Sequence, residues 1–249
     1  MRSRCCAATL SLMNSIADSL LLAAQLITRA DADLWRIVAL SLRVSATACV
    51  IGALIGLCLG AWLAVARFPG HRAVVWCVNT LLALPSVVVG LVVYLLLSRS
   101  GPLGAMGILF TPTAMVIAQS ILVVPLIAAL SRRLVLEGLS EGGDQLRSLG
   151  AGPFQSALLA LLHERFGVLT VLLTAFGRAV SEVGAVMIVG GNIDGFTRVM
   201  TTAIALETSK GDLPLALALG VVLLGVVGVI NLVISAVQGR TSLEREAYA

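Results

Sequence analysis

The stretch Asp144-Gln-Leu-Arg-Ser-Leu-Gly-Ala151 lies at the centre of a polar segment, residues 132–166, that interrupts a chain of long apolar runs. This segment holds eight of the thirty Asp, Glu, Lys and Arg residues, whereas the 95 residues from 37 to 131 hold four. Because Gly150-Ala-Gly-Pro153 supplies a helix stop and a turn, the segment is expected to contain short helices around a bend. A charged loop of this kind must contact something outside a membrane.

The composition indicates an all-α integral membrane protein. The chain is 59% hydrophobic and 12% charged, with a mean hydropathy of +1.03, whereas soluble domains carry about 25% charged residues. Its 249 residues suffice for five or six membrane-spanning helices of about 20 residues each. The 17 basic residues are scattered without a basic stripe, so we expect the lipid bilayer and no nucleic acid as a partner.

Motifs for catalysis and metal binding are absent from the sequence. The five cysteines do not form paired zinc-ligand spacings, so we expect no metal and no cofactor bound by this chain. The phosphate-loop pattern G-x-x-x-x-G-K-S/T does not occur, which argues against ATP hydrolysis by the chain itself. The chain also lacks G-x-S-x-G and H-E-x-x-H and contains two histidines, which argues against a membrane-embedded enzyme.

Five apolar stretches predict membrane-spanning helices, over residues 38–66, 74–97, 113–131, 167–189 and 215–237. The first carries small residues at intervals of four, which predicts a smooth face for close helix packing: Ala48, Gly52, Gly56, Gly60 and Ala64. Pro85 should kink or open the second span. Pro125 lies within the third.

The chain divides into three predicted parts: an N-terminal segment of residues 1–36, a transmembrane domain of residues 37–240 that contains the polar loop 132–166, and a charged tail of residues 241–249. In the N-terminal segment the spacing of the apolar residues favours an amphipathic helix at the membrane interface. A sixth span over residues 8–28 remains the alternative.

The distribution of charge predicts the orientation in the membrane. With five spans, the loops at residues 67–72 and 132–166 lie on one side together with the C-terminal tail. Together with Arg240, which directly precedes the tail, these regions hold eight arginines, and the opposite loops hold three basic residues. The positive-inside rule therefore favours a cytoplasmic C-terminus, although four arginines among the first 36 residues weaken the count.

Asp144 to Gly150 resembles the E-A-A-x-x-x-G signature of importer permeases of the ATP-binding cassette class, which lies about one hundred residues from the C-terminus. Asp144 stands in place of the glutamate, Gly150 stands at the glycine, and 99 residues follow Gly150. The two alanines are replaced by Gln145 and Leu146, and the family's later Leu-Pro pair is Leu162-His163.

This resemblance implies the type I importer permease fold, in which the polar loop forms a cytoplasmic coupling helix. The helix would dock on a separate ATPase subunit, which uses ATP and Mg²⁺. The residues that it assigns to coupling are Asp144, Arg147, Leu149, Gly150 and Ala151. An ordinary solvated loop with a glycine helix stop is the alternative.

Residues 176–211 resemble permeases of the molybdate, tungstate and sulfate type. Val189-Gly-Gly-Asn-Ile193 and Met200-Thr-Thr-Ala-Ile204 look most like the tungstate permeases. The resemblance implies a homodimeric pore in a bacterial or archaeal cytoplasmic membrane, which imports an oxyanion by alternating access after an extracytoplasmic binding protein delivers it. Tungstate is the expected substrate, with molybdate or sulfate as alternatives. A secondary transporter or channel is the rival from another class.

Charged and hydroxyl side chains near the fourth span are candidates for the translocation pathway. Arg178 and Glu182 are four residues apart and are predicted to share a helix face, where they either line the pathway or neutralise each other. Hydroxyl and amide donors suit an oxyanion, which offers acceptors alone, but the same residues also cap helices and form turns. The full set of candidates is Arg178, Ser181, Glu182, Asn192, Thr201, Thr202 and Ser86, with Thr197 and Thr208 as further donors.

Overall fold

The structure, a computed structural model, describes residue 21 and residues 32–247, so most of the predicted interfacial helix and the end of the predicted tail lie outside the described residues. Within the described residues the regular structure is helical. The elements are α2 (Ala32–Val65), α3 (His71–Leu81), α4 (Ser86–Leu97), η1 (Gly104–Met106), α5 (Pro112–Ser148), α6 (Pro153–His163), α7 (Arg165–Val180), α8 (Gly184–Gly190), α9 (Met200–Lys210) and α10 (Leu213–Ala247).

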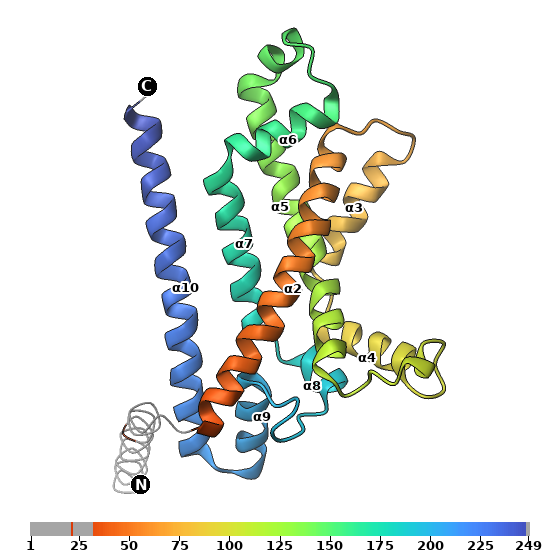
Figure 1. Ribbon diagram of the computed structural model, residues 1–249, viewed down its shortest axis with the longest axis vertical. Coiled ribbons are helices and arrows are strands. Elements are labelled where there is room, and N and C mark those ends of the chain that lie inside the picture. Colours follow the sequence, from red (N-terminus) through yellow and green to blue (C-terminus); the bar gives the residue numbers. More distant parts are fainter. Residues whose placement is uncertain (1–20, 22–31, 248–249) are drawn as a thin grey trace, which may run out of the picture.

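Among the described residues, three helices are long and apolar enough to cross a membrane: α2, α5 and α10. Two bent pairs raise the number of crossings to five if each pair counts as one span, because α3 and α4 meet at 100° and α6 and α7 meet at 79°. This agrees with the predicted fold class of about five transmembrane helices. In Figure 1 the α3–α4 pair descends beside α2 and then turns, so that α4 lies crosswise.

Figure 1 shows that the connections lie at two ends of the molecule. The α2–α3 turn, the α5–α6 turn and the C-terminal end of α10 lie together at one end, which we call the polar end. The η1 loop, α8 and α9 lie toward the other end, where α2 begins. The predicted grouping of loops is therefore confirmed.

The structure corrects several predicted boundaries. The polar loop does not contain a separate short helix before the bend, because α5 continues as one helix of 37 residues to Ser148. The fourth span ends at Val180 instead of continuing to Val189. Residues 32–36 form the start of α2, and the described part of the tail extends α10 to residue 247. Pro85 follows a helix break, as expected.

The small-residue face of α2 packs against α5 as the spacing predicts. A Cβ atom on Gly52 would lie 2.8 Å from Val123 Cγ1, and one on Gly56 would lie 2.8 Å from Ile127 Cβ. On Gly60 it would lie 2.6 Å from the carbonyl oxygen of Ala128. The glycines therefore let α2 and α5 approach almost backbone to backbone.

Candidate functional site

The turn at residues 144–151, to which the sequence resemblance assigns coupling and which we therefore call the coupling turn, is built by a glycine stop at the end of α5. Gly150 has φ +83°, in the left-handed region that favours glycine. Its N–H donates to the carbonyl of Arg147 at 3.0 Å, and the N–H of Ala151 donates to the carbonyl of Leu146 at 3.1 Å. This pair of bonds is a Schellman motif, which satisfies the last carbonyls of the helix and reverses the chain.

The coupling turn presents its side chains to solvent. Leu149 is 83% exposed. Asp144 lies in the penultimate turn of α5 and does not cap it, and its fully exposed carboxylate pairs with Arg147 at 3.4 Å. Because an exposed pair at this distance is weak, both side chains remain available to a partner.

Helix α6 supports the turn with one face and exposes the other. Pro153 occupies its first turn, and the Gln155 side chain accepts a hydrogen bond from the N–H of Gly152 at 3.0 Å. Its inner face packs against α2 and α5 in a core that includes Ala157 and Leu161.

The outer face of α6 carries apolar residues that the sequence analysis missed. Phe154, Leu158 and Leu162 are all 46–64% exposed, and their spacing of four places them on one helix face. The spacing of four is visible in the sequence and could have predicted this face. Together with Leu149 of the coupling turn, these three residues form an exposed apolar surface.

The break between α7 and α8 separates the two predicted pathway charges. Because α7 ends at Val180, Arg178 and Glu182 do not share a helix face, contrary to the prediction. Arg178 is exposed in the last turn of α7, whereas Glu182 is 5% exposed beyond its end. Among the described residues no ion pair joins them, and Glu182 Oε1 instead accepts from the N–H of Ala185 at 3.4 Å. Ser181 is exposed beside Arg178, and its hydroxyl donates to the Arg178 carbonyl.

Buried polar groups from two other helices hold this break in place. Thr201 of α9 donates its hydroxyl to the carbonyl of Glu182 at 2.8 Å. Gln119 of α5 donates through Nε2 to the carbonyl of Ala179 at 3.0 Å, and its buried Oε1 has no hydrogen-bond partner among the described residues. Gln119 was not among the predicted site residues, although a buried glutamine inside an apolar span is itself a signal.

The second helix break, before α4, abuts the first. A Cβ on Gly184 would lie 2.9 Å from Ser86 Oγ, and one on Gly90 would lie 2.8 Å from Ala185 Cα. The starts of α4 and α8 are therefore in close contact, with half-buried Ser86 at the junction. Ser86 therefore lies in the same region of the structure as Ser181 and Glu182, which lie just before α8.

The remaining predicted donors serve turns and helix ends. Thr197 donates to the carbonyl of Gly190 at 2.6 Å and accepts from the N–H of Ile193, and Thr202 caps the start of α9 through Val199. Asn192 donates to the carbonyl of Thr202 at 3.3 Å, while its buried Oδ1 lacks a hydrogen-bond partner in the part of the chain that the structure describes. Thr208 bonds within α9. In the described residues no group of three or more His, Cys, Asp or Glu could hold a metal ion.

Comparison with known proteins gives consistent matches. Residues 56–242 match the family described as binding-protein-dependent transport system inner membrane component. The chain is 44% identical over 226 residues to the tungstate uptake system permease protein TupB of Peptoclostridium acidaminophilum, covering 91% of this chain and 99% of the relative. It is 43% identical over 200 residues to a probable anion ABC transporter permease protein of Haloferax volcanii, covering 78% and 86%. The TupB protein of Campylobacter jejuni is 39% identical over 167 residues, covering 67% and 70%.

Proposed function

The chain belongs to the family of binding-protein-dependent transport system inner membrane components, and on that premise we propose that it is the permease subunit of an ATP-driven oxyanion importer. The substrate is tungstate, with molybdate and sulfate as the alternatives. The chain moves the oxyanion across the membrane without changing it chemically. The observation that carries the proposal is the coupling turn, which displays Asp144, Arg147 and Leu149 at the end of a helix that continues into the membrane.

The polar end faces the cytoplasm in this proposal, so the C-terminus is cytoplasmic. An ATPase subunit docks on the coupling turn and on the exposed apolar face of α6, and it supplies the ATP and Mg²⁺ chemistry. Apolar side chains of this kind in a charged region are typical of a surface that a partner covers. Because α5 is continuous from the turn to Gln119, a movement of the turn is transmitted to the break between α7 and α8.

The pathway runs past the two abutting helix breaks. Arg178 and Ser181 are exposed there in the single chain, and a second copy of the chain would complete the pore around them. An arginine without an acidic partner among the described residues is suited to attract a divalent oxyanion. Glu182, Thr201, Thr202 and Asn192 shape the region through the hydrogen bonds described above. A binding protein delivers the anion at the opposite end, on the loops that contain Phe110 and Gly191.

The preference for tungstate rests on the relatives, since two of the three relatives described above are named tungstate uptake permeases. The match to the first of them extends over nearly the whole length of both chains. Competition between tungstate and molybdate for uptake tests this preference directly, because equal inhibition would remove it.

The decisive experiment is uptake into proteoliposomes that contain the chain, its ATPase and its binding protein. We expect uptake of tungstate that requires ATP and is blocked by vanadate. Gly150→Pro should abolish uptake while the protein still inserts and dimerises, because proline cannot adopt φ +83° and lacks the N–H that bonds to Arg147. The matched control is Gly142→Ala, at a helical glycine with no atom within 4 Å of the added methyl group. Normal vanadate-sensitive uptake by Gly150→Pro would refute the coupling role, and gradient-driven flux without the ATPase would refute the importer.

A further inference from the structure

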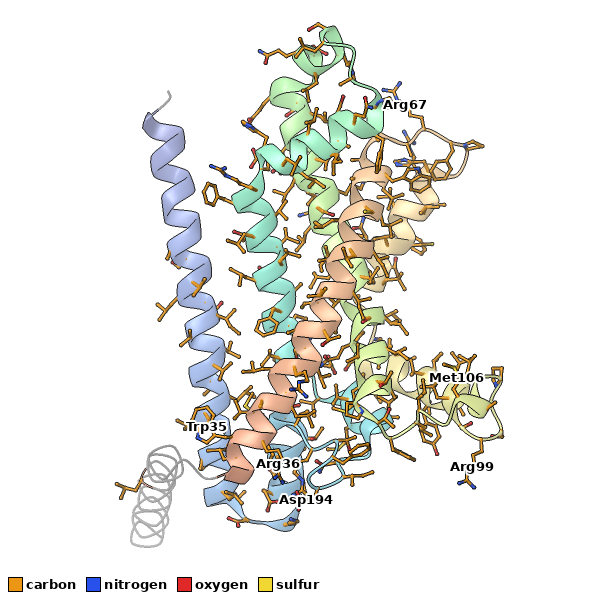
Figure 2. All side chains as sticks on the ribbon, viewed as in Figure 1. Trp35, Arg36, Arg67, Arg99, Met106 and Asp194 are labelled. Atoms are coloured by element: carbon orange, nitrogen blue, oxygen red, sulfur yellow. The ribbon has the colours of Figure 1, made fainter. Side chains whose placement is uncertain are left out.

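A large cavity opens at the polar end between the α2–α3 turn, the end of α5 and the start of α6. Its volume is about 1130 Å³. Arg67, Arg72 and Arg147 line it together with His71, and its apolar lining includes Phe68 and Leu139. Figure 2 shows Arg67 at this end of the molecule, beside the turn that follows α2.

The lining carries strong positive charge without local compensation. Among the residues that line the cavity there is no Asp or Glu. Within the described residues no carboxylate pairs with Arg67 or Arg72, and the contact of Arg147 with Asp144 is long and exposed. A cavity with three guanidinium groups, of which Arg147 alone has a carboxylate partner among the described residues, is a site for an anion.

The wall of the cavity is held in place at the end of α2. His71 Nε2 donates to the carbonyl of Leu63 at 2.8 Å, since a carbonyl oxygen can only accept a hydrogen bond. Arg132 of α5 donates through Nε to the same carbonyl at 3.4 Å. The start of α3 and the side chain of Arg132 are thereby both joined to the end of α2, which fixes the backbone on either side of Arg67 and Arg72.

The cavity lies at the level of the membrane surface. The apolar span of α2 ends at Val65, which itself lines the cavity. Trp62 stacks on Phe68 with ring centroids 5.3 Å apart, and Trp62 and Trp76 are 44% and 68% exposed. Exposed tryptophans at the end of a span are typical of the headgroup layer.

We propose that this cavity binds the phosphate headgroup of an anionic phospholipid from the adjacent leaflet. The guanidinium groups take the phosphate, and the apolar lining with the exposed side chains of α3 receives the upper acyl chains. Basic pockets between helices at the cytoplasmic surface recognise anionic headgroups in this way. The volume and the apolar lining favour a lipid over a free tetraoxyanion, which is far smaller and offers nothing to the apolar wall. The inference rests on the proposed function only in placing the polar end, and therefore the cavity, on the cytoplasmic side of the membrane.

The site would link lipid composition to transport. Arg147 and Ala151 belong to the coupling turn and also line the cavity. A bound headgroup would therefore contact both the α2–α3 turn and the coupling turn, and it would restrict the movement of the coupling turn. Lipid binding itself needs neither ATP nor a binding protein, so it is measured independently of import.

The test titrates the delipidated full-length permease in neutral detergent with fluorescent phosphatidylglycerol and, separately, with fluorescent phosphatidylcholine. Arg67→Gln/Arg72→Gln should weaken phosphatidylglycerol binding about 25-fold, at roughly fivefold for each arginine near the headgroup. The matched control, Arg133→Gln/Arg165→Gln, removes the same charge from the polar end at positions that do not line the cavity and should change it less than threefold. Arg67→Lys/Arg72→Lys keeps the charge and should retain most of the affinity, which separates loss of charge from loss of fold.

Equal binding of the two lipids, or an equal loss in the control variant, would overturn the proposal. Displacement of phosphatidylglycerol by millimolar inorganic phosphate or tungstate would identify a soluble-anion site instead. Release of the lipid when the ATPase is added would assign the cavity to the subunit interface. The proposed import function survives each of these outcomes, because it depends on uptake and on Gly150.

Discussion

Gly60→Ala should destabilise the protein more than any comparable methyl addition to a helical glycine outside the α2–α5 contact. At Gly60 the added Cβ would lie 2.6 Å from the carbonyl oxygen of Ala128 and 3.0 Å from the N of Arg132, and it would overlap Ser131 Oγ. Two of these obstacles are backbone atoms of α5. A side chain could rotate away, but a backbone atom cannot move unless α2 and α5 separate.

The cost follows from those contacts. Overpacking a close helix contact costs about 1–3 kcal/mol. Displacing Ser131 also removes the hydrogen bond of its hydroxyl, whose one proton is shared between the carbonyls of Gly56 and Ala128, both at 3.3 Å. A hydrogen bond inside a membrane protein is worth about 0.6 kcal/mol on average. We therefore expect a loss of about 2–4 kcal/mol in the free energy of unfolding. At Gly142 the same substitution meets no atom within 4 Å and should stabilise the helix by up to about 1 kcal/mol.

The free energy of unfolding of both variants is measured in bicelles by steric trapping, with retention on size exclusion as the check for assembly. The reasoning predicts opposite signs for the two substitutions. If Gly60→Ala unfolds at the same free energy as Gly142→Ala, the close approach of α2 and α5 does not contribute to stability and the argument fails.

Three further predictions concern the site. Leu149→Ala should weaken ATPase binding about tenfold, since burying a leucine is worth about 1.5–3 kcal/mol, whereas Leu224→Ala on α10 should leave ATPase binding unchanged. The affinity of the labelled ATPase for each permease variant is measured, and equal effects of the two substitutions would contradict the prediction. Arg178→Gln should slow tungstate uptake roughly tenfold, the value of one charge-assisted hydrogen bond, with assembly intact and with partial recovery in Arg178→Lys; an unchanged rate would exclude Arg178 from the pathway. Thr201→Val should lower the free energy of unfolding by about 0.6 kcal/mol through loss of the bond to the Glu182 carbonyl; a change below the error of the measurement would show that this bond does not hold the break.

Local chemistry made part of the fold predictable. The glycines of α2 recur at intervals of four, and only close packing explains so many of them in one helix, so their contact with α5 followed from spacing. Gly150 was predictable as a bend because few residues other than glycine adopt its φ. Pro85 was predictable as a break, but Pro125 does not interrupt α5, since a membrane helix tolerates a proline where its surroundings satisfy the freed carbonyl.

Long-range contacts made the rest unpredictable. The fourth span reads as one apolar run, yet α7 ends at Val180. Beyond that end, Thr201 of another helix donates to the carbonyl of Glu182, a contact that the local sequence does not indicate. The spacing of Arg178 and Glu182 was therefore a misleading signal. The candidate donors in residues 192–202 could not be separated from capping residues without their partners, and in the structure most of their hydrogen bonds go to nearby backbone groups.

The uninterrupted length of α5 makes it a lever. About 30 residues separate Gln119 from Leu149, which is roughly 45 Å at 1.5 Å per residue. A tilt of about 5° at the coupling turn would therefore displace the far end by about 4 Å, more than the width of a hydrogen bond. Such a small rotation suffices to break the bond from Gln119 to Ala179, so a modest change of shape in a docked subunit is amplified at the membrane-embedded breaks.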